Sequence, residues 1–257
     1  MTMLRRRATA LCLATFLLWP SPSLWADEGG APLVQLQQYR PIYLLLGKPD
    51  VKAQISFKGQ LLRSFDLYYG YSQLMIWDLF EKSSPFRDIN YNPEIFYRIH
   101  LSRPTERWLD AGLIEHESNG RDGAASRSWN RSYLSFHSKN QLGAKTALWW
   151  SLRAWFPYGY HQDNADILQY RGLWEAHIAL TEFLGPFFKI HELTLRIYGG
   201  GKSHVNPLQG GQELTFRTQV ASGAITPAIV LQVFHGFGEY MLNYRDERVG
   251  LRAGLGF

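Results

Sequence analysis

A histidine and a serine stand two residues apart in the middle of the chain, within a polar segment that differs from the sequence around it. If this segment is a β-strand, His116 and Ser118 project from the same face, because successive side chains point to opposite faces. A serine hydroxyl becomes a nucleophile toward an ester carbonyl when a base within hydrogen-bonding reach accepts its proton. The pair predicts acyl-ester chemistry, with Ser118 as nucleophile and His116 as base.

A base of this kind needs a third group that holds its ring in place. Asn130 lies at the start of the next candidate strand, and it shares the outward face with His116 if the two strands pair antiparallel. Its amide oxygen can accept a hydrogen bond from one imidazole nitrogen and leave the other nitrogen free toward Ser118. Histidine, serine and asparagine are also ordinary residues of loops and barrel rims, so the spacing by itself leaves a purely structural interpretation open.

The elements that carry these residues show a two-residue periodicity of apolar side chains. Segments of about ten residues with one apolar and one polar face are typical of transmembrane strands, although a soluble β-sandwich also alternates. The last segment ends on Phe257 and resembles the closing strand of bacterial outer-membrane barrels. We therefore predict an all-β fold, an antiparallel transmembrane β-barrel of about twelve strands. The clearest alternating segments are residues 148–156, 174–181, 192–197, 213–220 and 248–257.

The N-terminus has the features of a secretory signal peptide. Three arginines at positions 5–7 precede an apolar stretch over residues 11–19, which is too short to span a membrane as a helix. We place the cleavage after Ala26 and predict a single domain over residues 27–257. Removing the leader changes the 27 basic and 22 acidic residues of the chain to 24 and 22, so the charge indicates no nucleic-acid partner. Cys12, the one cysteine of the chain, leaves with the leader.

Several segments resemble the outer membrane phospholipase A family. Residues 116–121, His-Glu-Ser-Asn-Gly-Arg, and residues 126–131, Ser-Arg-Ser-Trp-Asn-Arg, look like the signature of that family, with the same separation of histidine, serine and asparagine. Residues 83–87 and 90–93 are similar to another family segment, and the stretch from 232 to 250 is similar to its last two strands. The resemblance is dense at the site and patchy elsewhere.

The resemblance implies a twelve-stranded barrel in the bacterial outer membrane, with the serine, histidine and asparagine on its outer wall. In that family the serine hydrolyses sn-1 and sn-2 acyl esters of glycerophospholipids and lysophospholipids and releases fatty acids. Two barrels associate as a homodimer when active, and calcium is required. We therefore expect a calcium-dependent phospholipase A that receives its phospholipid substrate from the membrane.

The resemblance also implies the groups that stabilise the tetrahedral intermediate. Backbone N–H groups of Ser118 and Gly120 match the family's oxyanion donors. Calcium is expected to be held by the Arg121 carbonyl, the Ser126 hydroxyl and the carbonyl of Ser83 of the partner subunit, mostly through water. Calcium prefers such oxygen ligands.

The chain departs from the family pattern at two places. Glu117 replaces the aspartate that is usual between the histidine and the serine, and it is expected to point to the opposite face of the strand. Residues 69–77 are more apolar than the family's strand, which predicts a looser or differently packed dimer contact. A non-catalytic outer-membrane barrel and a lipopolysaccharide deacylase are alternative functions. Ser126 and residues 83–87 favour the phospholipase.

Overall fold

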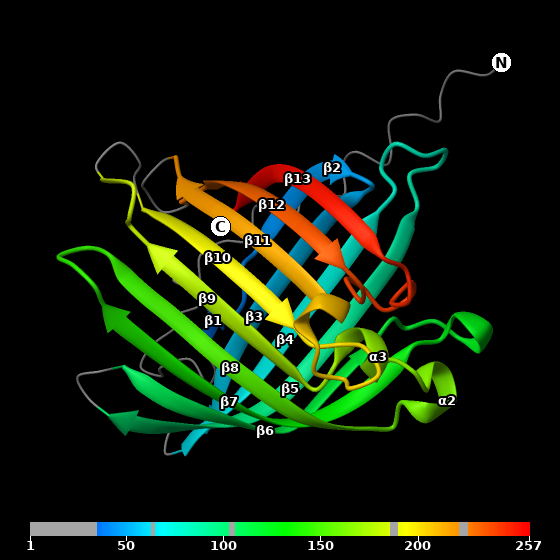
Figure 1. The fold of residues 1–257 in the computed structure, drawn as a ribbon, viewed down its shortest axis with the longest axis horizontal. Helices are drawn as coiled ribbons and strands as arrows, with labels where there is room; N and C mark the ends of the chain where they lie inside the picture. Colours follow the sequence, from blue (N-terminus) through cyan, green and yellow to red (C-terminus); the bar gives the residue numbers. More distant parts are fainter. Residues whose placement is uncertain (1–34, 63–64, 103–105, 186–189, 221–225) are drawn as a thin grey trace, which may run out of the picture. The chain divides into compact units, whose positions relative to one another are not determined.

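The structure is a computed structural model that describes residues 35–62, 65–102, 106–185, 190–220 and 226–257. The predicted signal peptide, residues 1–26, lies outside the described residues. Residues 36–257 form one compact unit, drawn in Figure 1. Its strands are β1 (Leu36–Gln38), β2 (Tyr43–Lys48), β3 (Val51–Leu62), β4 (Phe65–Trp77), β5 (Phe86–Ser102), β6 (Arg107–Ser118), β7 (Ser128–Gln141), β8 (Ala147–Tyr158), β9 (Trp174–Thr181), β10 (His191–Tyr198), β11 (Gly211–Gln219), β12 (Ala228–Gly236) and β13 (Arg248–Gly256).

Strands β2 to β13 pair in chain order and close into a ring. Every neighbouring pair is antiparallel, and the ring closes because the last strand, β13, pairs with β2. β1 is a short additional strand that pairs with the second half of β3, beyond the residues that β2 covers. Figure 1 shows the strands following one another around this barrel. The prediction of an antiparallel barrel of about twelve strands is confirmed.

The strands alternate between an apolar outer face and a filled interior. In β12 every second residue is exposed, and Ile229, Leu231 and Val233 all point outward. A continuous wall of exposed apolar side chains is typical of a barrel whose outside is covered by lipid rather than water. The alternation that predicted the strands is therefore a consequence of two different surroundings on their two faces.

Ion pairs fill the interior and join strands that are not neighbours. The Arg252 guanidinium on β13 is fully buried and donates to Asp50 at 2.6 Å and to Glu239 at 2.7 Å. The Lys52 ammonium on β3 donates to Glu213 on β11 at 2.6 Å. Because burying an unpaired charge is costly, these partners hold one another in place. Such a filled interior disfavours the alternative of an open, passive pore.

The connections at one end of the barrel include short helices. α2 (His161–Asn164) and α3 (Leu168–Arg171) both lie in the β8–β9 connection, and 3₁₀ turns lie at Gly123–Ala125 and Pro207–Gln209. Among the described residues, no helix is long and apolar enough to cross a membrane.

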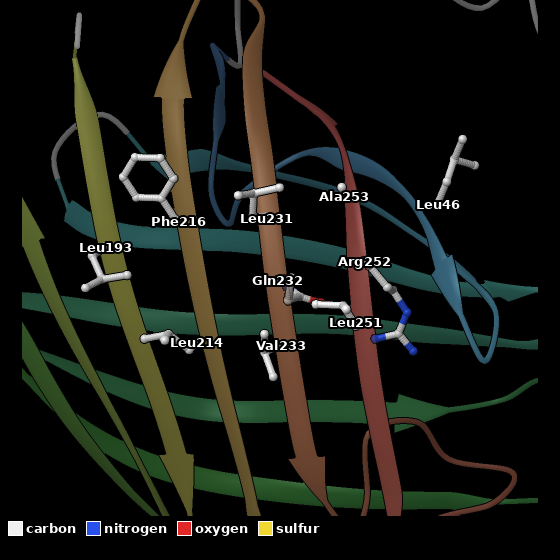
Figure 2. A pocket seen from close by; sticks show the side chains of 10 residues that line it. All are labelled: Leu46, Leu193, Leu214, Phe216, Leu231, Gln232, Val233, Leu251, Arg252 and Ala253. Atoms are coloured by element: carbon white, nitrogen blue, oxygen red, sulfur yellow. The ribbon is translucent and has the colours of Figure 1, made fainter. Parts of the chain in front are cut away.

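A hollow on the outer wall lies over β2 and β10–β13. Figure 2 shows the apolar side chains that surround it. Ala253 lies in register with Leu46 on one neighbouring strand and with Leu231 on the other, so its small side chain leaves a space between two leucines. The buried side chains of Gln232 and Arg252 lie behind it. The predicted catalytic residues are on β6 and β7, on other strands of the barrel.

Candidate active site

A β-bulge in the middle of β6 determines which of its residues face outward. The pairing register shifts between Gly112 and Glu115 against β7, and at the same place against β5. Leu113 and Ile114, which lie between these positions, are both exposed, although neighbours in a strand normally face opposite sides. One extra residue at this point exchanges the inner and outer faces for the remainder of the strand.

Beyond the bulge, the odd-numbered residues of β6 face the interior. Glu117 is buried and accepts hydrogen bonds from the indole N–H of Trp129 at 3.0 Å and from the Arg131 guanidinium at 2.9 Å. His116 and Ser118 therefore lie on the outer wall, where both are partly buried. Glu117 points to the opposite face from these two residues, as expected for the position at which this chain departs from the family pattern.

His116 and Asn130 face each other across β6 and β7. They are direct partners in the antiparallel register, and Nδ1 of His116 lies 2.9 Å from Oδ1 of Asn130. Because an amide oxygen can only accept, this contact places the imidazole proton on Nδ1. Nε2 is then free to accept a proton, and Ser118 is the next residue along the same face.

The β6–β7 loop, residues 119–127, is held by its first residue. The buried Asn119 side chain donates to the Ala125 carbonyl at 2.9 Å and accepts from the backbone N–H of Arg127 at 3.0 Å. Gly120 has a φ of +62°, and a Cβ atom there would lie 2.9 Å from the Tyr91 ring. A glycine is therefore required at this position, and the backbone N–H groups that follow Ser118 are fixed in orientation.

The loop is also tied to α2, a contact that the sequence did not predict. The Ser126 hydroxyl donates to Oδ2 of Asp163 at 2.8 Å, and the Ser128 hydroxyl donates to the same oxygen at 3.2 Å. The backbone N–H of Ser128 donates to the buried Asn164 side chain at 2.8 Å. Asp163 and Asn164 lie more than thirty residues beyond the motif, in a turn-rich segment, so no spacing in the sequence associates them with Ser126.

The predicted calcium residues lie in two connections of the chain, Arg121 and Ser126 in the β6–β7 loop and Ser83 in the β4–β5 turn. The Arg121 guanidinium donates to the backbone carbonyl of Arg87, and its Nε lies 3.8 Å from the buried carboxylate of Asp88. Ser83 has a φ of 70°, and its carbonyl was predicted to reach the ion from the partner subunit. The side chains of the described residues also form no group of three or more histidines, cysteines or acids around a metal position.

The oxygens around Ser126 nevertheless suit one class of metal. A hydroxyl and a carboxylate oxygen lie 2.8 Å apart at Ser126 and Asp163, and the carbonyls of the β6–β7 loop follow directly. Hydroxyl, carboxylate and carbonyl oxygens are ligands of calcium, whereas zinc prefers nitrogen and sulfur. The donor set fits calcium, with Asp163 added to the residues that the sequence indicated.

Comparison with known proteins gives consistent results. The chain is 28% identical over 228 residues to a putative phospholipase A1 of Neisseria meningitidis serogroup B, an alignment that covers 82% of this chain and 55% of that protein. It is 29% identical over 218 residues to phospholipase A1 of Escherichia coli K12, covering 79% of this chain and 68% of that protein. The chain thus spans about half the length of the Neisseria relative.

Solved structures show the same fold. Outer membrane phospholipase A from Escherichia coli superposes with a TM-score of 0.73 at 23% identity, covering 86% of this chain and 94% of that chain. A Salmonella typhi outer membrane phospholipase, crystallised as a dimer with bound calcium, superposes with a TM-score of 0.72 at 24% identity, covering 87% and 92%. The model of the phospholipase A1 family matches residues 31–257. Because this match extends over most of the chain, the protein belongs to the phospholipase A1 family.

Proposed function

We propose that this protein is a calcium-dependent serine hydrolase of the bacterial outer membrane that cleaves sn-1 and sn-2 acyl esters of glycerophospholipids and lysophospholipids. The observation that carries the proposal is the hydrogen bond between His116 and Asn130 on the outer wall, with Ser118 on the same face. Membership of the phospholipase A1 family supports it. The predicted signal peptide, residues 1–26, accounts for export.

In the first half of the reaction, the Ser118 hydroxyl attacks the ester carbonyl while Nε2 of His116 accepts its proton. The imidazolium that forms donates through Nδ1 to Asn130, which holds the ring in orientation. The oxyanion of the tetrahedral intermediate accepts hydrogen bonds from the backbone N–H groups of Ser118 and Gly120. When the intermediate collapses, His116 returns the proton to the leaving alcohol, a lysophospholipid or glycerol derivative.

In the second half, water completes the cycle. The acyl group is now esterified to Ser118, and His116 accepts a proton from a water molecule that attacks the acyl carbonyl. The collapse of the second intermediate releases the fatty acid and restores the serine hydroxyl. The same two side chains and the same oxyanion donors therefore serve both steps.

The substrate reaches the site from the membrane rather than from a water-filled cleft. The outer wall beside the catalytic residues is apolar, and the large side chains of Leu113, Ile114, Leu134 and Phe156 are all exposed there. An acyl chain in the bilayer contacts these residues while its ester lies at Ser118. This arrangement explains why a hydrolase carries its catalytic residues on the outside of a barrel.

Calcium and a second copy of the chain complete the proposal. Ser126, Asp163, the Arg121 carbonyl and Ser83 of the partner subunit would hold the ion, which supplies positive charge for the developing oxyanion. The bound calcium and dimeric state of the Salmonella typhi protein support this part. Because the calcium ligands come from two copies of the chain, we expect activity to depend on self-association.

The test is fatty acid release from mixed micelles of a defined phospholipid by the purified full-length protein. We expect calcium-dependent activity that is abolished by Ser118→Ala and by a chelator. Ser203→Ala, which changes a serine of the β10–β11 loop, is the matched control and retains activity. Equal inactivity of wild type and Ser118→Ala, with folding verified, would contradict the proposal; release of fatty acid from lipopolysaccharide alone would instead support the deacylase alternative.

A further inference from the structure

Gly159, the residue that follows β8, lies against the side chain of Asn130. β8 pairs with β7, and Tyr158 is the register partner of Asn130. Gly159 has a φ of +66°, in the left-handed region that favours glycine. A Cβ atom at this position would lie 2.6 Å from Nδ2 of Asn130, which is too close for two atoms that are not bonded. The Asn130 amide can therefore occupy its position only because residue 159 has no side chain.

The Asn130 amide is thus confined on two sides. Its Oδ1 lies 2.9 Å from Nδ1 of His116, and its Nδ2 faces the Cα of Gly159. A carboxamide is a rigid planar group, so a displacement of Nδ2 also moves Oδ1. A methyl group at residue 159 would push the amide out of the position from which its oxygen accepts a hydrogen bond from the imidazole N–H.

The backbone of Gly159 is itself held and cannot easily withdraw. On one side it continues from β8, which is paired with β7 up to Tyr158. On the other side it leads into α2, where the backbone N–H of Asn164 donates to the Tyr160 carbonyl at 3.0 Å. The Asn164 side chain in turn accepts from the backbone N–H of Ser128 at 2.8 Å. A collision at residue 159 is therefore relieved by the Asn130 side chain rather than by the main chain.

We propose that Gly159 is a positioning residue for the hydrolysis, which fixes the orientation of Asn130 and through it the tautomer of His116. The proposal rests on the proposed function for its effect on catalysis. Its effect on the imidazole, in contrast, follows from the contacts of the free protein. The proposed site therefore requires a glycine at position 159 in addition to the side chains of His116, Ser118 and Asn130. The sequence motif formed by those three residues does not include position 159.

The test compares Gly159→Ala with Gly185→Ala. Gly185 also has a positive φ, of +72°, but an added Cβ atom would meet no atom of the described residues within 4 Å, so its substitution strains the backbone without a collision. We expect Gly159→Ala to lower kcat about 10- to 100-fold with little change in KM, since a misplaced catalytic group costs a loss of this order. Gly185→Ala should keep kcat within about twofold, because that backbone strain lies outside the site.

Two further variants separate the collision from general damage. In the Asn130→Ala background, Gly159→Ala should cause no additional loss of kcat, because the residue acts through Asn130. Gly159→Asn should remain impaired, since asparagine tolerates the left-handed backbone but still carries a Cβ atom. Equal losses of kcat in both backgrounds, or full activity of Gly159→Asn, would overturn the proposal.

A spectroscopic readout tests the same point without catalysis. The nitrogen NMR spectrum of the histidine-labelled protein, with His116 assigned by His116→Gln, should show a proton fixed on Nδ1 in the wild type. Gly159→Ala should shift the His116 signals toward an average of the two tautomers, and Gly185→Ala should leave them unchanged. Identical His116 spectra in all three proteins would refute the role of Gly159, whereas equal inactivity of wild type and Ser118→Ala would refute the proposed function alone.

Discussion

Replacing Asn130 with alanine measures what one hydrogen bond contributes to the proposed reaction. Asn130 lies on the outer wall, its contact with His116 is 2.9 Å long, and the side chain takes no part in the interior ion pairs. We therefore expect Asn130→Ala to fold as a barrel with unchanged thermal stability and to bind substrate as the wild type does. The loss should be confined to kcat.

The size of that loss follows from the charge that His116 carries in the transition state. A hydrogen bond to a charged group contributes about 1.5–3 kcal/mol, and each 1.36 kcal/mol corresponds to a factor of ten in rate. Asn130→Ala should therefore lower kcat about 10- to 150-fold. Ser118→Ala should lower it much further, because that variant removes the proposed nucleophile.

A second substitution of Asn130 tests whether the hydrogen-bond acceptor opposite His116 is what matters, rather than the amide group as such. Asn130→Asp keeps an oxygen opposite Nδ1 of His116, so its kcat should lie within about tenfold of the wild type and above that of Asn130→Ala. The assay is initial fatty acid release at saturating phospholipid in mixed micelles with calcium present. A loss of less than threefold in Asn130→Ala, or a loss as large as that of Ser118→Ala, would refute the assignment of Asn130 as the orienting residue.

Three further predictions follow from contacts elsewhere in the molecule. Arg252→Met removes the fully buried cation that Asp50 and Glu239 share, and leaves Asp50 only Arg248 and Glu239 only Lys52 and Arg248. The free energy of unfolding in urea should therefore fall by about 3 kcal/mol, whereas an unchanged value would mean that the remaining cations compensate in full. Asp163→Ala removes a carboxylate beside Ser126 and should raise the calcium concentration for half-maximal activity about 10- to 100-fold; an unchanged calcium titration would place the ion elsewhere. Burial raises the pKa of Asp166, but hydrogen bonds from Arg245 and Tyr244 outweigh burial and hold the pKa below its ordinary value. The stabilisation by this carboxylate is therefore complete above the ordinary carboxyl pKa and lost as the pH falls through the lowered value, so Asp166→Asn should flatten the acid side of a plot of melting temperature against pH.

Much of the barrel was predictable because two different surroundings impose a two-residue period. The predicted segment 174–181 coincides with β9, and the segment 192–197 lies within β10. Lipid on one side and a polar, packed interior on the other select opposite residue types at successive positions. The alternation is clearest in β12 and β13, where exposed residues and buried or partly buried residues follow one another along the strand.

The contacts of the loops were not predictable in the same way. Ser126 was identified from a family motif, but its hydrogen-bond partner Asp163 comes from the connection between two later strands. A loop side chain has no periodic surroundings, and its partners depend on which connections meet at one end of the closed barrel. Gly159 is a similar case, since its requirement arises from the proximity of Asn130 rather than from the local sequence.

The bulge in β6 explains how the predicted face is reached. Before the bulge, Asp110 and Gly112 face the interior, so an unbroken strand would also turn His116 and Ser118 inward. Because of the extra residue, His116 and Ser118 face the outer wall instead. Their imidazole and hydroxyl groups lie there in an otherwise apolar surface. Polar groups in contact with lipid are expensive and are retained where they have a function. The bulge is therefore the feature of the fold that brings the proposed catalytic pair to the outer wall.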